Sequence, residues 1–111
     1  MKLYLDMDGV IANFEKRYIE LFNESPGSAR DRKMFSKNWT KFIEGKHFET
    51  LEWWPGASEL ITYVSTNFPH ENVEILTSSG GNKYHDEVEI QKKVWVKRMN
   101  LSEKWKVNVV A

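Results

Sequence analysis

Two carboxylates two residues apart, Asp6 and Asp8, are the side chains in this sequence best suited to chemistry. They follow the apolar run Leu3-Tyr4-Leu5, which predicts a buried strand. A strand continuing through both acids would point them the same way, where their charges repel unless a cation or proton separates them. One carboxylate could then attack phosphorus while the other passes a proton to the leaving oxygen. The alternative is an ordinary strand-end acid followed by a turn.

A second polar segment follows the strand predicted at 73–77. Thr77-Ser78-Ser79-Gly80-Gly81 combines hydroxyl groups with a glycine-rich backbone. Hydroxyls and free backbone N–H groups after a strand form phosphate-binding nests. The segment therefore favours a phosphate site, and the alternative is a Ser/Gly loop with no role.

Hydrophobic periodicity places these residues in an α/β protein. Strands are predicted at 3–5, 73–77 and 106–110, and helices at about 12–23, 35–43, 60–68 and 86–99. Strands that alternate with helices indicate a three-layer fold with a parallel sheet. Such sheets bind ligands at the carboxyl ends of their strands, so Asp6 and Thr77 are expected on the same rim.

Composition narrows the class of protein. The chain has 111 residues, which predicts a single domain, and no cysteine, which excludes disulfides and thiolate metal sites. The N-terminus does not resemble a signal peptide, and no stretch reaches the roughly 20 apolar residues of a membrane span. These features indicate a soluble, cytoplasmic protein.

The charge sums to zero but is segregated. Six basic and two acidic residues lie in 28–46, and six basic and one acidic in 92–106. The zero total argues against a general nucleic-acid binder, so no stable nucleic-acid complex is expected. The basic segments either frame a site for an anionic substrate or are solvated helix faces.

Four segments together resemble a known family. Asp6-Met7-Asp8-Gly9-Val10 resembles the first motif of the haloacid dehalogenase (HAD) superfamily, Asp-x-Asp-Gly-Val, and Ile75-Leu76-Thr77-Ser78-Ser79 is similar to its second motif. Within that superfamily the chain resembles the small 5′(3′)-deoxyribonucleotidases, whose helical cap follows the first strand. Segment 47–57, which leads into the helix before the second motif, and Lys93-Val94-Trp95-Val96, similar to a Lys-x-x-Trp helix, add to that likeness.

The resemblance implies a HAD-like domain over 1–111 with a helical cap inserted at 14–54. It implies that Asp6 is the nucleophile and a Mg²⁺ ligand, and that Asp8 is the general acid/base and binds the metal through its carbonyl. Thr77 and Ser78 would bind the phosphoryl group, and Lys93 would add positive charge. Phe14 and the insert aromatics Phe35, Trp39 and Phe42 would wall a base pocket, or else form the core of the cap.

The sequence departs from the family in two respects. The third motif, a lysine after the third strand, and the fourth, an acidic pair after the fourth strand, do not occur before Ala111. We therefore expect a sheet truncated after its third strand, with the first strand as an exposed apolar edge that could pair with a second copy as a homodimer.

The predicted function is a Mg²⁺-dependent phosphohydrolase. The expected substrate is a small phosphate ester, a nucleoside monophosphate, cleaved through an aspartyl-phosphate intermediate as in a 5′-nucleotidase. One alternative is a catalytically impaired HAD-like fragment that binds phosphate or a partner without turnover. Another is an oligonucleotide-binding module that uses the basic, aromatic insert.

Overall fold

Three parallel strands form the sheet. The structure is a computed structural model that describes residues 1–28 and 32–111, with only the backbone of residues 28 and 32. The strands are β1 (Leu3–Leu5), β2 (Val73–Ser78) and β3 (Lys106–Val110), hydrogen-bonded in that order. Leu3 pairs with Val73, and Ile75 pairs with Val107. The predicted α/β class and parallel sheet are confirmed.

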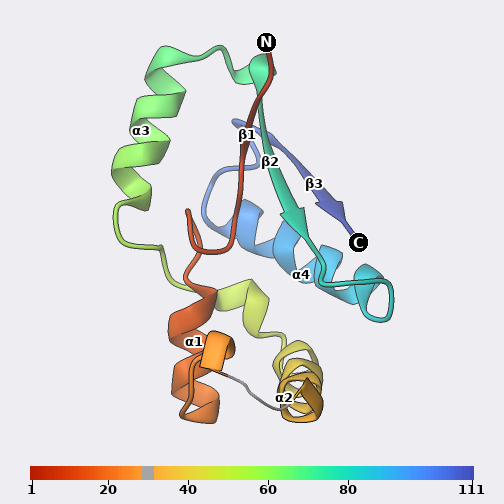
Figure 1. Ribbon diagram of the computed structural model, residues 1–111. Helices are drawn as coiled ribbons and strands as arrows, with labels where there is room; N and C mark the ends of the chain where they lie inside the picture. Colours follow the sequence, from red (N-terminus) through yellow and green to blue (C-terminus); the bar gives the residue numbers. More distant parts are fainter. Residues whose placement is uncertain (29–31) are drawn as a thin grey trace.

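Two helices connect the strands. Helix α3 (Ala57–Asn67), with the 3-10 turn η3 (His70–Asn72), precedes β2, and α4 (His85–Arg98) joins β2 to β3. In Figure 1, α4 passes behind the strands and α3 lies beside β1. Apolar residues of both helices and of the sheet share one buried cluster, which includes Ile61, Ile75 and Val96.

The predicted three-layer arrangement is not found within residues 1–28 and 32–111. The sheet face that carries Tyr4, Leu76 and Val110 is open, with Tyr4 52% and Val110 49% exposed. The physical reason is handedness. Both crossovers step in the same direction along the sheet, and right-handed crossovers then place α3 and α4 on the same face.

The insert between β1 and α3 forms a separate helical group. It contains α1 (Phe14–Phe22), the 3-10 turn η1 (Pro26–Ser28), α2 (Arg32–Glu44) and the 3-10 turn η2 (His47–Thr50), in the lower half of Figure 1. Its two ends are hydrogen-bonded side by side: Asn13 N–H donates to Glu52 O at 2.9 Å, and Trp54 N–H donates to Ile11 O at 2.9 Å. The insert therefore leaves and rejoins the core at one point.

Aromatic side chains fill the insert. Tyr18, Phe42 and Phe48 are fully buried. The buried Asn38 amide donates to the Tyr18 hydroxyl at 3.1 Å, which satisfies both polar groups. Helix α4 fastens this group to the core, because Trp95 Nε1–H donates to Leu51 O at 2.8 Å.

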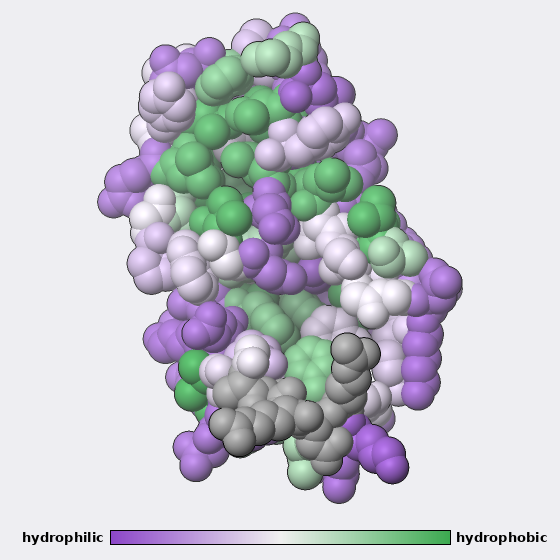
Figure 2. All heavy atoms as spheres, in the orientation of Figure 1, coloured by the Kyte–Doolittle hydropathy of each residue, from purple (hydrophilic) through white to green (hydrophobic). Residues whose placement is uncertain are grey.

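The molecular surface reflects this division. In Figure 2, apolar atoms gather in the upper half of the view, over the strands and α3 of Figure 1. Within the described ranges β1 is hydrogen-bonded to β2 alone, so its outer edge is open. Pairing of that edge with a second copy remains a prediction. None of the helices in the described part of the chain combines the length and apolar character needed to cross a bilayer.

Candidate active site

A tight loop after β1 positions Asp8. The carbonyl of Met7 accepts backbone N–H groups from Val10, Ile11 and Ala12 at 2.8–3.3 Å. Gly9 has φ +77°, a left-handed conformation that glycine adopts without a Cβ penalty. Because Met7, Ile11 and Ala12 are all buried without exposure, the loop is anchored in the core.

The side chain of Lys92 occupies the centre of the site. Its ammonium donates to Asp8 Oδ2 at 2.9 Å, to Thr77 Oγ1 at 2.7 Å and to Ser78 O at 2.7 Å. Its Nζ also lies 5.0 Å from the centroid of the Phe48 ring. Three donors meet three oxygens, which is what a lysine with no solvent exposure requires.

The hydrogen bonds of Lys92 leave one potential donor and one potential acceptor without a partner among the described residues. Thr77 Oγ1 accepts from Lys92, so its own proton is available to donate elsewhere. The second carboxylate oxygen of Asp8, Oδ1, is buried and has no partner among the described residues. A buried polar oxygen without a partner is costly to the fold.

Asp6 lies on the open face of the sheet. With Thr77 and Ser78 it lines a hollow of about 360 Å³, whose floor also includes Tyr4, Leu76 and Val110. Its Oδ1 accepts the Met7 N–H at 2.7 Å. The structure therefore brings Asp6, Thr77 and Ser78 to the same rim, and Thr77 links this hollow to the Lys92–Asp8 pair.

The expectation that one strand carries both acids is wrong. β1 ends at Leu5, and the chain turns at once around the Met7 carbonyl. Strand alternation therefore does not orient Asp6 and Asp8. Asp6 is exposed on the rim, whereas Asp8 is half-buried and held by α4 through Lys92.

Lys93 is not the lysine at the rim. Its side chain is exposed and pairs with Glu89 at 3.1 Å along the surface of α4. One residue turns a helix by about 100°, so Lys93 points away from the buried face that carries Lys92. Two signals could have found Lys92. One is its helical spacing from Val88, and the other is the Lys-x-x-Trp pattern, which Lys92 forms with Trp95 and which Lys93, two residues before Trp95, does not.

The loop after β2 uses much of its own hydrogen-bonding capacity. Ser79 N–H donates to Val110 O at 2.7 Å, and Gly80 N–H donates to Ser78 Oγ at 3.0 Å. The expected nest of free N–H groups is therefore partly filled from within the chain. The hydroxyl protons of Thr77 and Ser78 are available to a ligand, because both oxygens act as acceptors in the bonds described.

An aromatic slot adjoins this loop. Phe35, Ser36 and Trp39 of α2 and Gly80 line a cavity of about 270 Å³. Phe14 and Phe42 do not line it. The Phe14 ring instead packs against four aromatic rings in the core of the insert, and Phe42 is fully buried.

Candidate metal ligands fall in two places. Asp6 has one carboxylate oxygen outside the Met7 hydrogen bond, and with the Asp8 carbonyl it offers the hard oxygen donors that Mg²⁺ prefers. Among residues 1–28 and 32–111, neither acid belongs to a group of three possible ligands. Such a group occurs at His85, Asp86 and Glu89, in the first two turns of α4. The carboxylate rim thus fits Mg²⁺ weakly, with water and phosphate oxygens needed as further ligands.

The basic segments are mostly solvated helix faces. Lys33, Lys37 and Lys41 of α2 are exposed, as are Lys93 and Lys97 of α4. Arg30 lies outside the described residues. Among the described basic residues of these segments whose side chains are described, Lys92 is the one that is buried.

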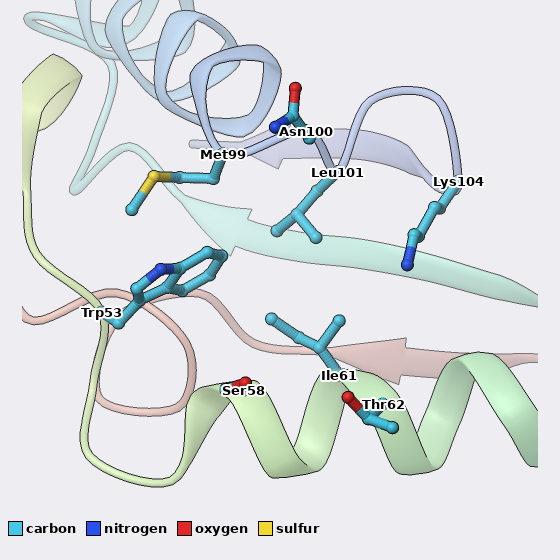
Figure 3. Close-up of a pocket in the computed structure, with 8 residues that line it drawn as sticks. All are labelled: Trp53, Ser58, Ile61, Thr62, Met99, Asn100, Leu101 and Lys104. Carbon is cyan, nitrogen blue, oxygen red and sulfur yellow. The ribbon is translucent and has the colours of Figure 1, made fainter.

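A further hollow of about 210 Å³ lies between α3 and the end of α4, lined by Trp53, Ser58, Ile61, Thr62, Met99, Asn100, Leu101 and Lys104. Ile61 and Leu101 point toward each other across it, and the Trp53 ring lies to one side (Figure 3). Its lining contains no carboxylate and does not include Lys92 or the residues that Lys92 contacts.

No protein-family model matches this chain, and no curated protein matches it either.

Proposed function

We propose that this chain is a phosphomonoester hydrolase of the haloacid dehalogenase type, with Asp6 as its nucleophile. The observation that carries the proposal is the convergence of one exposed carboxylate, two hydroxyls and a buried ammonium at the carboxyl ends of β1 and β2. Positive charge and hydroxyl donors stabilise a phosphoryl group, and a free carboxylate oxygen can attack it.

In the first step, Asp6 attacks the phosphorus atom of the ester. A bond forms between its carboxylate oxygen and phosphorus, and the bond from phosphorus to the leaving oxygen breaks. Asp8, which Lys92 holds through Oδ2, supplies a proton to that oxygen. Thr77 donates its free proton to a phosphoryl oxygen.

In the second step, water attacks the aspartyl phosphate. Asp8 takes a proton from this water, the bond between phosphorus and the Asp6 oxygen breaks, and inorganic phosphate leaves. Lys92 holds Asp8 in place through both steps because its other two protons are fixed on Thr77 and Ser78. Mg²⁺, held by Asp6 and the Asp8 carbonyl, would supply positive charge for the phosphoryl oxygens.

The aromatic slot supports a nucleoside monophosphate as the substrate. Phe35 and Trp39 offer nearly parallel rings, 6.1 Å between centroids and 19° between planes. Gly80, which completes the slot, is two residues from Ser78 on the rim. Aromatic rings stack on every nucleobase, so the proposed ligand is a nucleotide with its phosphate on the rim and its base in the slot.

The test is phosphate release from deoxynucleoside monophosphates with and without Mg²⁺. We expect Mg²⁺-dependent release that disappears in Asp6→Asn. Release that persists unchanged in Asp6→Asn would exclude Asp6 as the nucleophile.

Phosphate binding without turnover is the second candidate. It is favoured by the metal-ligand set, because Asp6 is the one carboxylate on the rim and the three-ligand group at His85 is separate from it. Binding of a nucleotide without phosphate release at any Mg²⁺ concentration would select this candidate.

A further inference from the structure

Trp39 of the insert contacts Gly80 in the loop that follows β2. Gly80 has φ +82°, and a Cβ built there would lie 2.8 Å from Trp39 Cζ2 and 3.4 Å from Cε2 and Cη2. Real Cβ atoms essentially never approach a neighbour as closely as 2.8 Å. Glycine is thus required here both by the backbone conformation and by the indole that rests on it.

Three aromatic rings pack around the indole of Trp39. Phe14 and Phe48 lie edge-on to it at 5.9 and 5.6 Å between centroids, and Phe35 stacks against it. The loop is also constrained, because Gly80 N–H is bonded to Ser78 Oγ. A side chain at position 80 would therefore displace either the wall of the slot or the loop.

We propose that Gly80 is a specificity-determining residue that favours ligands with a planar ring. Because Gly80 has no side chain, Trp39 can lie against the loop and form one wall of the slot. This inference rests on the proposed function, since it assumes that the phosphate of the same ligand binds at Thr77 and Ser78. A ring in the slot contacts Trp39 and Phe35, whereas a small phosphate ester reaches only the rim.

The chain provides a matched control for Gly80→Ala. Gly81 also has a positive φ, +123°, but a Cβ there would meet nothing within 4 Å. Gly81→Ala therefore introduces backbone strain without touching Trp39. A second control is Trp39→Phe, whose smaller ring lacks the atoms that the new Cβ would meet.

The experiment measures binding of thymidine 5′-monophosphate and of glycerol 3-phosphate to the full chain. ¹⁹F NMR of 5-fluorotryptophan-labelled protein reports on Trp39, with its resonance assigned by its loss in Trp39→Phe. We expect thymidine monophosphate to shift that resonance. We expect Gly80→Ala to weaken its binding at least about fivefold, the lower end for loss of one stacked ring, and to leave glycerol phosphate binding unchanged.

Three results would overturn the inference: no shift at Trp39, equal losses in Gly80→Ala and Gly81→Ala, or equal losses for the two ligands. In the double variant Trp39→Phe/Gly80→Ala, the alanine should cause little further loss beyond Trp39→Phe. A full additional loss there would also count against it. Absence of phosphate release, with the Trp39 shift and the Gly80 effect intact, would instead refute the proposed hydrolysis alone.

Discussion

The ammonium nitrogen of Lys92 lies 2.9 Å from Oδ2 of Asp8, so helix α4 directly holds the loop that follows β1. Lys92 has no solvent exposure, while the Asp8 side chain is 34% exposed. The pair therefore joins a fully desolvated cation to an acid that a ligand can still reach.

Removal of this cation should destabilise the chain. Lys92→Met would leave the Asp8 carboxylate and the Ser78 carbonyl without their donor, at a cost of about 1–3 kcal/mol in the free energy of unfolding. Lys93→Met is the matched control, and its exposed pair with Glu89 predicts a change within about 0.5 kcal/mol. Urea unfolding of both variants measures the difference. Equal losses would show that Lys92 does not carry this role.

Substitution of Asp6 and of Asp8 should affect phosphate release and beryllofluoride binding differently. Asp6→Asn deletes the proposed nucleophile, so it should abolish both phosphate release and attachment of beryllofluoride, a mimic of the aspartyl phosphate. Asp8→Asn keeps Asp6, so it should slow phosphate release while beryllofluoride still binds. Fluorine NMR and a phosphate assay measure these two properties. Beryllofluoride binding by Asp6→Asn would place the covalent site elsewhere.

Two buried tryptophans differ in whether their indole N–H is hydrogen-bonded, so substituting each one should change the free energy of unfolding by a different amount. Trp95 Nε1–H donates to Leu51 O at 2.8 Å, whereas the indole N–H of Trp105 is buried with no partner among the described residues. Both substitutions to Phe lose similar volume. Trp95→Phe should therefore cost about 1 kcal/mol more than Trp105→Phe. Thermal or urea unfolding tests this, and a greater loss in Trp105→Phe would contradict it.

His47 should make stability depend on pH. Burial lowers the pKa of His47 from its usual 6.5, and the neighbouring Arg17 guanidinium lowers it further. Arg17 can only donate, so the His47 Nδ1 at 3.3 Å accepts, as in a neutral imidazole. The unfolded chain then binds this proton more readily than the folded chain, and stability falls as pH drops below about 6.5.

The measurement is the free energy of unfolding from pH 8 to pH 5 in the wild type and in His47→Gln. The wild type should lose more stability than the variant over this range. His70→Gln, which removes an exposed histidine bonded to Ser65, is the control for the loss of a histidine as such. Parallel profiles for the wild type and His47→Gln would refute the assignment.

The strands were predictable because their residues carry strong local signals. Runs such as Val73-Glu74-Ile75-Leu76 are rich in β-branched and apolar side chains, and Lys106–Val110 appears as predicted. Lys92 was missed because a lysine on a helix is normally assigned to solvent, and a shift of one residue changes the face. The Trp39–Gly80 contact was not predictable, since no local pattern brings two such distant residues together.

The register of the sheet also bears on the order in which the site is assembled. β2 and β3 are joined through α4, with Ile75 opposite Val107, whereas β1 meets β2 only after the whole insert and α3 have been traversed, with Leu3 opposite Val73. Closing the longer loop costs more chain entropy and slows folding. We therefore expect the parallel unit of β2, α4 and β3 to form first, with Thr77 and Lys92 already in contact. The acidic loop would then arrive last, so that docking of β1 completes the site and the fold in a single event.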